Sequence, residues 1–183
     1  MARQADRLAS YTSSPGAGMT PTVRSANADD IPELARLRWQ LYTERGTHDE
    51  PFDAYGERFA VFAGDALARD DWRAWCAEQD GRLVAAMWLH TVPRVPAPGH
   101  GDPRPMGYLT NMYVEPEHRS LGLGSQMLQL LIESCTTGGF ELVLTFPADD
   151  AYGFYERNGF TRPPDPVVHR LGHGPPAGGG LIA

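Results

Sequence analysis

The sequence contains no lysine, and all 16 of its basic residues are arginines. A phosphate-binding P-loop needs a lysine after its glycines, so that mode of nucleotide binding is excluded. GC-rich codon usage explains the absence of lysine more simply than a need to exclude self-modification at lysine side chains does. Cysteine is almost as scarce, because only Cys76 and Cys135 are present. Two isolated cysteines give neither a disulfide framework nor a zinc spacing, which favours a reducing, cytoplasmic setting.

Long apolar runs are also missing, and none approaches the ~20 residues that span a bilayer. The first 19 residues have no signal-peptide core. We therefore expect no membrane partner. The formal net charge is −7, which argues against nucleic acid, because phosphate binding needs a basic face. It mildly favours a cationic or neutral small substrate. The six histidines show no paired ligand spacing, so we expect no metal.

The 183 residues suffice for one domain that buries roughly 70% of its unfolded surface. Residues 1–20 are rich in Ser, Gly and Ala and are expected to form a flexible leader. Residues 172–183 begin with "GHGPPAGGG" and are expected to form a flexible tail. Residues 21–171 lie between them without a repeat or a change of composition, which predicts a single folded domain.

Hydrophobic periodicity predicts an alternation of strands and helices between these ends. We expect helices at 27–45, near 53–69, at 123–135 and at 148–158, the last closed by Gly159. Strands are expected at 21–26, at 107–114, at 140–146 (buried) and at 166–171, with a hairpin over 72–92 that turns at Asp80-Gly81. Residues 93–105 are too rich in Pro and Gly for a strand and predict a long loop. This order predicts a mixed α/β (α+β) domain whose sheet carries helices on both faces.

The stretch "YVEPEHRSLGLGSQMLQLLIESC", residues 113–135, joins an Arg and two glycines to the start of an apolar helix. The first N–H groups of a helix have no intrahelical partner, and they attract anions together with the helix dipole. Gly122 and Gly124 would let an anion approach the backbone, and Arg119 would add a fixed charge. The same residues also fit a tight turn that binds no anion, in which the glycines only relieve crowding and Arg119 lies on the surface. A dinucleotide fingerprint does not fit, because Met127 stands where its third glycine belongs.

The segment "NMYVEPEHRSLGLGSQML" resembles the acyl-CoA-binding segment of the GNAT N-acetyltransferase superfamily, whose pattern is V-x-P followed by [RQ]-x-x-G-x-[GA]. About thirty residues later, "AYGFYERNGF" is similar to the family's A-x-x-x-Y-x-x-x-G-F segment. The whole resemblance spans about residues 22–171. It implies a mixed, mostly antiparallel twisted sheet of six to seven strands, with about four helices on both faces.

The resemblance implies acetyl-CoA as co-substrate and assigns roles to individual residues. The pyrophosphate would lie on the backbone amides of the loop formed by Arg119, Ser120, Leu121, Gly122, Leu123, Gly124 and Ser125. The strand before this loop would be bulged and splayed from its parallel neighbour, and the pantetheine arm would pair along Met112, Tyr113 and Val114. The Met112 N–H would donate to the thioester oxygen. Tyr155 would protonate the departing thiolate, with Tyr152 as the alternative hydroxyl.

The same resemblance leaves the general base without a residue. Some family members carry Glu where this chain has Leu109, and many carry Asn where it has Ala148. Thr110 and Asn111 are polar but cannot act as bases, and Glu115 and Glu117 are expected to face solvent. In the family, the segment "THDEPFD" borders the acceptor site, so we expect Asp49 and Glu50 to contact substrate along with Asn111. His48 and Asp53 complete that acidic cluster.

These observations together predict an acetyl-CoA-dependent N-acetyltransferase that acts on a primary amine of a small molecule, such as a cationic metabolite or antibiotic. Two alternatives stay open. One is acetylation of a protein or peptide amine, and the other is a non-catalytic acyl-CoA-binding module. A homodimer is expected only by analogy with the fold.

Overall fold

A single twisted sheet forms the middle layer of the protein, described here from a computed structural model over residues 20–46 and 49–162. Within these residues the sheet has five strands in the order β1-β2-β3-β4-β5. The first four are antiparallel neighbours, and β5 joins β4 in parallel. The strands are β1 (Thr22–Ser25), β2 (Trp72–Gln79), β3 (Arg82–Val92), β4 (Met106–Val114) and β5 (Leu142–Leu144).

The expected mixed, mostly antiparallel sheet is confirmed, but the expected six to seven strands are not found in the described part of the chain. The further strand expected at 166–171 lies outside the described residues, as do nearly all of the expected leader (1–20) and the whole expected tail (172–183).

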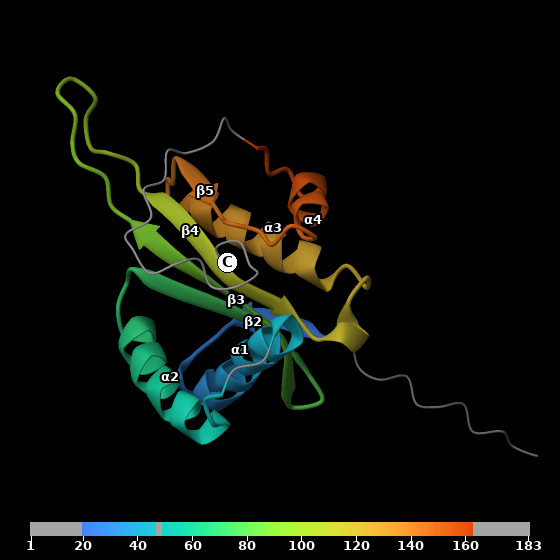
Figure 1. Ribbon diagram of the computed structural model, residues 1–183. Coiled ribbons are helices and arrows are strands. Elements are labelled where there is room, and N and C mark those ends of the chain that lie inside the picture. Colours follow the sequence, from blue (N-terminus) through green and yellow to red (C-terminus); the bar gives the residue numbers. More distant parts are fainter. Residues whose placement is uncertain (1–19, 47–48, 163–183) are drawn as a thin grey trace, which may run out of the picture.

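Two pairs of helices cover the two faces of the sheet (Figure 1). On one face, α1 (Ile31–Arg45) and α2 (Phe52–Leu67) build a core with β2, β3 and Tyr113. On the other face, α3 (Leu123–Thr137) and α4 (Tyr152–Arg157) build a second core around Leu109 and Met127. The four predicted helices are therefore confirmed, with ends shifted by a few residues. None of the described helices is long and apolar enough to cross a membrane.

The start of α1 differs slightly from the sequence prediction. Asn27 caps a short 3₁₀ turn, η1 (Ala28–Asp30), and α1 begins directly after it. The Asn27 side chain accepts a hydrogen bond from the Asp29 N–H at 2.8 Å, and the Asp30 carboxylate accepts one from the Asn27 N–H at 2.8 Å. This reciprocal pair satisfies N–H groups that the helix start would otherwise leave without partners.

The hairpin β2–β3 turns at Asp80 and Gly81, as predicted. Both residues have positive φ, 51° and 78°, as a two-residue hairpin turn of this hand requires. The loop of residues 93–105 then extends away from the sheet before β4 begins (Figure 1).

Two details of the predicted core are wrong. The strand expected at 140–146 is shorter and is not buried, because β5 pairs on one side only within the described residues and Leu142 stays 43% exposed. On α3, the apolar spacing predicts one buried side made of Leu123, Met127, Leu130 and Leu131, but Leu128 is buried in place of Leu130, which is 36% exposed. Buried residues therefore recur every fourth position from Leu123 to Cys135, and Leu128 adjoins that row.

Candidate active site

Strand β4 contains a β-bulge at Asn111 and Met112. Thr110 pairs with Trp88 and Tyr113 pairs with Ala86, so two residues of β4 lie opposite Met87 alone. Asn111 adopts a positive φ of 54°, which Asn tolerates better than most residues. The additional residue changes which side chains face which helices. Leu109 packs in the α3–α4 core, whereas Tyr113, four residues later, packs in the α1–α2 core.

The edge of β4 that faces β5 is unpaired beyond its first three residues. The parallel ladder runs from Met106–Leu142 to Tyr108–Leu144 and ends there. In the described residues no strand pairs with this edge of β4 from Leu109 to Val114. The geometry is the bulge and splay that the sequence resemblance implied. An extended ligand that carries amide groups could hydrogen-bond to this edge as an added strand would.

Tyr155 reaches the bulge from α4. Its hydroxyl lies 3.7 Å from Met112 Sδ, and its ring packs edge-on against Phe154 and Phe160. The side chain is 6% exposed, and burial raises the pKa of Tyr155 above its ordinary value, so the phenol is protonated at neutral pH. Tyr152 lies one turn earlier, and its ring is covered by the Arg162 guanidinium at 4.1 Å. Of the two hydroxyls, the Tyr155 hydroxyl is the one that contacts β4.

The turn before α3 presents a run of backbone amides without partners. Ser120 and Gly122 have positive φ values of 62° and 80°, and no side chain caps the helix. Among the described residues, no hydrogen bond of good geometry is donated by the N–H groups from Ser120 to Ser125. The first partnered N–H in this helix is that of Gln126, which donates to Gly122 O at 3.0 Å. Such a run of free amides at a helix start suits an anion.

The two glycines of this turn serve different purposes. Gly122 has open space where a Cβ would be, so its positive φ is what requires glycine there. At Gly124, a Cβ would lie 3.1 Å from Phe154 Cζ. Gly124 therefore lets α4 pack closely against the start of α3, next to Tyr155.

Arg119 is held away from the free amides by other contacts. Its Nε donates to Val114 O at 2.9 Å, its Nη2 donates to the Glu44 carboxylate, and its guanidinium lies 5.6 Å from the Tyr113 ring centroid. The Tyr113 hydroxyl also donates to Glu44. Burial opposes ionisation of Glu44, but these two hydrogen bonds, together with the positive charges of Arg119 and Arg45, hold the pKa of Glu44 below its ordinary value. Glu44 thus ties the end of α1 to the loop, a role that the sequence did not indicate.

Glu115 does not face solvent as expected. Its side chain is 1% exposed and accepts hydrogen bonds from Arg36 at 2.7 Å and Arg82 at 2.9 Å. Because both guanidiniums neutralise it, Glu115 fixes the loop after β4 to α1 and β3. One potential metal-ligand atom from each of Glu115, Glu117 and His118 lies within 4.8 Å of the other two. The carboxylate of Glu115 is, however, already committed to the two arginines.

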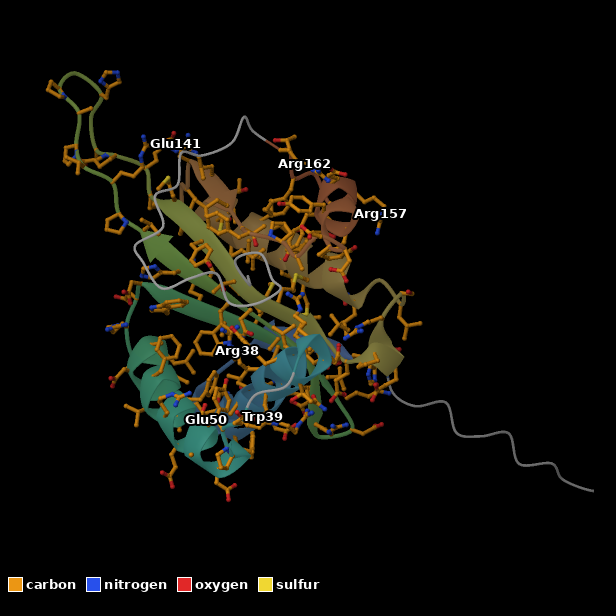
Figure 2. The ribbon with its side chains drawn as sticks, in the orientation of Figure 1. Arg38, Trp39, Glu50, Glu141, Arg157 and Arg162 are labelled. Atoms are coloured by element: carbon orange, nitrogen blue, oxygen red, sulfur yellow. The ribbon has the colours of Figure 1, made fainter. Side chains whose placement is uncertain are left out.

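A cavity of about 350 Å³ lies on the α1–α2 side of β4, beside the bulge. Asn111 lines it, and the Asn111 Oδ1 accepts a hydrogen bond at 2.6 Å from Arg38, which projects from α1 toward the sheet (Figure 2). Ten residues line the cavity: Arg38, Tyr55, Arg58, Phe59, Phe62, Trp72, Trp88, Tyr108, Thr110 and Asn111. No carboxylate and no imidazole belongs to this described lining.

The acidic segment predicted to border the acceptor touches the cavity only indirectly. Glu50 forms an ion pair with Arg58, which lines the cavity, and Figure 2 shows Glu50 at the beginning of α2. Asp49 and Asp53 are exposed and do not line it. His48 lies outside the described residues. Of the three substrate-contacting residues expected from sequence, Asn111 is the one in the cavity wall.

Comparison with known proteins finds a family model that matches most of the chain. The model of the acetyltransferase (GNAT) family matches residues 31–160. A glucosamine 6-phosphate N-acetyltransferase from Trypanosoma brucei brucei is 27% identical over 88 residues, which span 48% of this chain and 57% of that protein's length.

Two crystal structures of acetyltransferases share the fold. A predicted acetyltransferase from Clostridium acetobutylicum, solved with acetyl-CoA, superimposes with a TM-score of 0.71 at 20% identity, over 83% of this chain and 97% of that one. A GCN5-related N-acetyltransferase from Ralstonia eutropha JMP134 superimposes with a TM-score of 0.69 at 22% identity, over 83% and 99%.

Proposed function

Because this chain belongs to the acetyltransferase (GNAT) family, we propose that it transfers an acetyl group from acetyl-CoA to a primary amine of a small molecule. One observation carries the proposal. The Tyr155 hydroxyl, the bulge at Met112 and the unpaired edge of β4 adjoin one another, and the cavity opens on the other side of the same bulge.

The residues present fit acetyl-CoA. The free amides from Ser120 to Ser125 would hold the pyrophosphate, and the unpaired edge at Met112, Tyr113 and Val114 would hold the pantetheine arm. When bound, acetyl-CoA supplies an activated acetyl thioester. Arg119 would contribute little to the pyrophosphate in this conformation, because its guanidinium is engaged by Glu44.

Three tasks fall to this chain's own residues. Met112 lies in the bulge without a partner in the strand register, and its N–H would donate to a carbonyl oxygen that gains negative charge. Tyr155, kept protonated by burial, holds the proton that a departing thiolate needs. The third task, removing a proton from the amine, has no carboxylate or imidazole in the described cavity lining. The amine would therefore bind in its neutral form or lose its proton to water.

A small-molecule acceptor is favoured over a protein because the cavity is a compact volume of about 350 Å³ walled by aromatic side chains. The name of the Trypanosoma relative, an N-acetyltransferase of an amino sugar, supports an amine as the acceptor group. A non-catalytic acyl-CoA-binding module remains the competing function. It predicts tight CoA binding and no thiol release with any amine.

The test is thiol release from acetyl-CoA across a panel of primary amines, repeated with Tyr155→Phe. We expect Tyr155→Phe to lower kcat by about 10²-fold or more, because general acid catalysis contributes about that much. The fold should survive, because a Phe ring at this position would keep the packing against Phe154 and Phe160. Tyr152→Phe is the matched control and should leave kcat nearly unchanged. Full kcat across pH in Tyr155→Phe would exclude Tyr155 as the acid.

A further inference from the structure

The polar groups of the cavity beside the bulge suit an anion better than a cation. Resting on the proposed function, we propose that the amine acceptor also carries an anionic group, a carboxylate or a phosphate, on a flat or ring-shaped body. Arg38 and Arg58 bind that anionic group, and the aromatic walls bind the body.

Arg38 carries a positive charge that no carboxylate neutralises within the described residues. Its Nη1 donates to Asn111 Oδ1 at 2.6 Å and its Nη2 to the Tyr42 hydroxyl at 3.0 Å, and both partners are neutral. No ion pair in the described part of the chain includes Arg38. A half-buried guanidinium with neutral partners is a receptor for a carboxylate or phosphate, whose oxygens match its planar fork.

Arg58 adds a second guanidinium to the same cavity. It pairs with Glu50, but the two side chains are 67% and 33% exposed, and an ion pair so open to water is weak. An anion in the cavity can therefore share or replace Glu50 as the partner of Arg58. The net negative charge of the whole chain favoured a cationic substrate, but the charged side chains that line this cavity, Arg38 and Arg58, are both positive.

Two further polar atoms of the lining side chains have no partner. The Tyr55 hydroxyl and Trp88 Nε1 are buried without a hydrogen bond among the described residues, and the Trp88 side chain is only 2% exposed. Burial raises the pKa of Tyr55 to about 12, so its hydroxyl keeps its proton. Buried polar atoms are rarely left without a partner, and both of these atoms can donate. The cavity wall is therefore rich in donors, as an acceptor-rich ligand requires.

Aromatic rings supply the rest of the wall. Tyr55, Phe59, Phe62, Trp72, Trp88 and Tyr108 line the cavity, and several of them meet edge to face. Such walls bind flat rings and the apolar faces of sugars, and they also attract cations. Repulsion from the two guanidiniums opposes a cation at this site. A ring with an anionic substituent is attracted by both the arginines and the aromatic wall.

The experiment compares amines that differ only in the anionic group, at saturating acetyl-CoA. The carboxylate pair is 4-(aminomethyl)benzoate and 4-(aminomethyl)benzamide, and the phosphate pair is glucosamine 6-phosphate and glucosamine. We expect the anionic member of at least one pair to exceed its neutral twin by tenfold or more in kcat/KM. The pair that shows the preference identifies carboxylate or phosphate. Neutral members that equal or exceed their anionic twins in both pairs overturn the inference and leave the proposed function intact.

Calorimetric binding of analogues without the amine separates this inference from the proposed function. We expect 4-methylbenzoate or glucose 6-phosphate to bind, and 4-methylbenzamide and glucose to bind at least tenfold more weakly. This binding preference is expected even if no amine releases thiol. The absence of thiol release would contradict the acetyltransferase proposal but not the anion site. Equal binding of charged and neutral analogues overturns the anion site whatever the turnover.

Arg58→Gln tests the site within the protein, because Arg58 is exposed enough to be replaced without unfolding. We expect KM for the preferred anionic amine to rise about tenfold or more, and the preference for the anionic amine over its neutral twin in kcat/KM to fall by about the same factor. Arg69→Gln is the matched control, since it also removes one surface charge, paired with Asp71, but does not line the cavity. An equal loss for both twins in Arg58→Gln would mean that Arg58 has a structural role and would contradict the proposal.

Discussion

Asp30 joins the start of α1 to the sheet through a nearly buried carboxylate. It accepts hydrogen bonds from both terminal nitrogens of Arg24 at 2.7 Å and from the Asn27 N–H at 2.8 Å, and its side chain is 8% exposed. The hydrogen bonds from Arg24, helped by Asn27, hold the pKa of Asp30 below its ordinary value of 3.8 although burial opposes them. Ionised Asp30 therefore stabilises the fold above that value, and the contribution is lost as pH falls through the folded pKa.

Asp30→Asn should lower the free energy of unfolding by about 1.5–3 kcal/mol at pH 7, the size typical of hydrogen bonds to charged groups. Below about pH 4 the difference from the native protein should shrink, because Asp30 takes up a proton first in the unfolded chain and, at still lower pH, in the folded protein. Denaturant unfolding at pH 7, 5, 4 and 3 measures both effects. Asp29→Asn is the control, because Asp29 is exposed, and it should change stability by less than about 0.5 kcal/mol. A difference equal at pH 3 and pH 7 would contradict the assignment.

Single residues were predictable where a motif names them and unpredictable where only tertiary contacts do. Tyr155 and the turn from Arg119 to Ser125 could be located because their spacing forms a recognisable pattern. Arg38 contacts Asn111 across 73 positions, and Arg119 contacts Glu44 across 75. No local pattern marks such pairs, so the arginines of the cavity were missed.

At the scale of elements, the turn into α3 separates two reasons for glycine. Gly122 has a φ of 80° and free space around it, whereas Gly124 has ordinary backbone geometry and a close neighbour in Phe154. A side chain at position 122 would therefore strain the backbone, whereas a side chain at position 124 would press on Phe154 of α4.

Gly122→Ala should therefore cost about 1–3 kcal/mol of stability, the strain of a left-handed residue with a side chain. Gly124→Ala should change stability by less than about 1 kcal/mol, because the better helix propensity of Ala offsets the pressure on Phe154. The displaced α4 should instead lower kcat, since it carries Tyr155. Urea unfolding and thiol release on both variants provide the comparison. A larger stability loss at Gly124 than at Gly122 would reverse these assignments.

Elements were predictable where local chemistry determines them. Asp80-Gly81 fixed the hairpin, and apolar spacing fixed four helices within a few residues. The length of β5 was not predictable, because "FELVLTF" has the composition of a strand throughout and only its pairing with β4 decides where the strand ends. The bulge at Asn111 has no local sequence signal either. Only the resemblance to a known family implied it.

At the scale of the whole molecule, neither lysine nor cysteine supplies a nucleophile for a covalent acetyl-enzyme at the cavity. The chain has no lysine. Burial raises the pKa of Cys76 to about 11, and burial also raises the pKa of the Cys135 thiol, so both thiols are protonated at neutral pH. Neither cysteine lines the cavity.

We therefore expect direct transfer between two substrates bound at the same time. Incubation with acetyl-CoA alone should add no acetyl group to either cysteine, and initial-rate plots with both substrates varied should intersect. Mass spectrometry of the intact protein and of its Cys peptides checks the first expectation, and steady-state kinetics check the second. Parallel rate plots together with an acetylated cysteine would establish a covalent intermediate instead.

Two of the four tryptophans, Trp72 and Trp88, line the cavity, and Trp75 is 7% exposed in the core on the opposite face of the sheet. The protein therefore carries its own optical reporter. A ring that enters the cavity would change the emission of Trp72 and Trp88 and leave that of Trp75 as an internal reference. Trp75→Phe would remove that part of the background, so acceptors could be ranked by fluorescence quenching, without turnover and without a label.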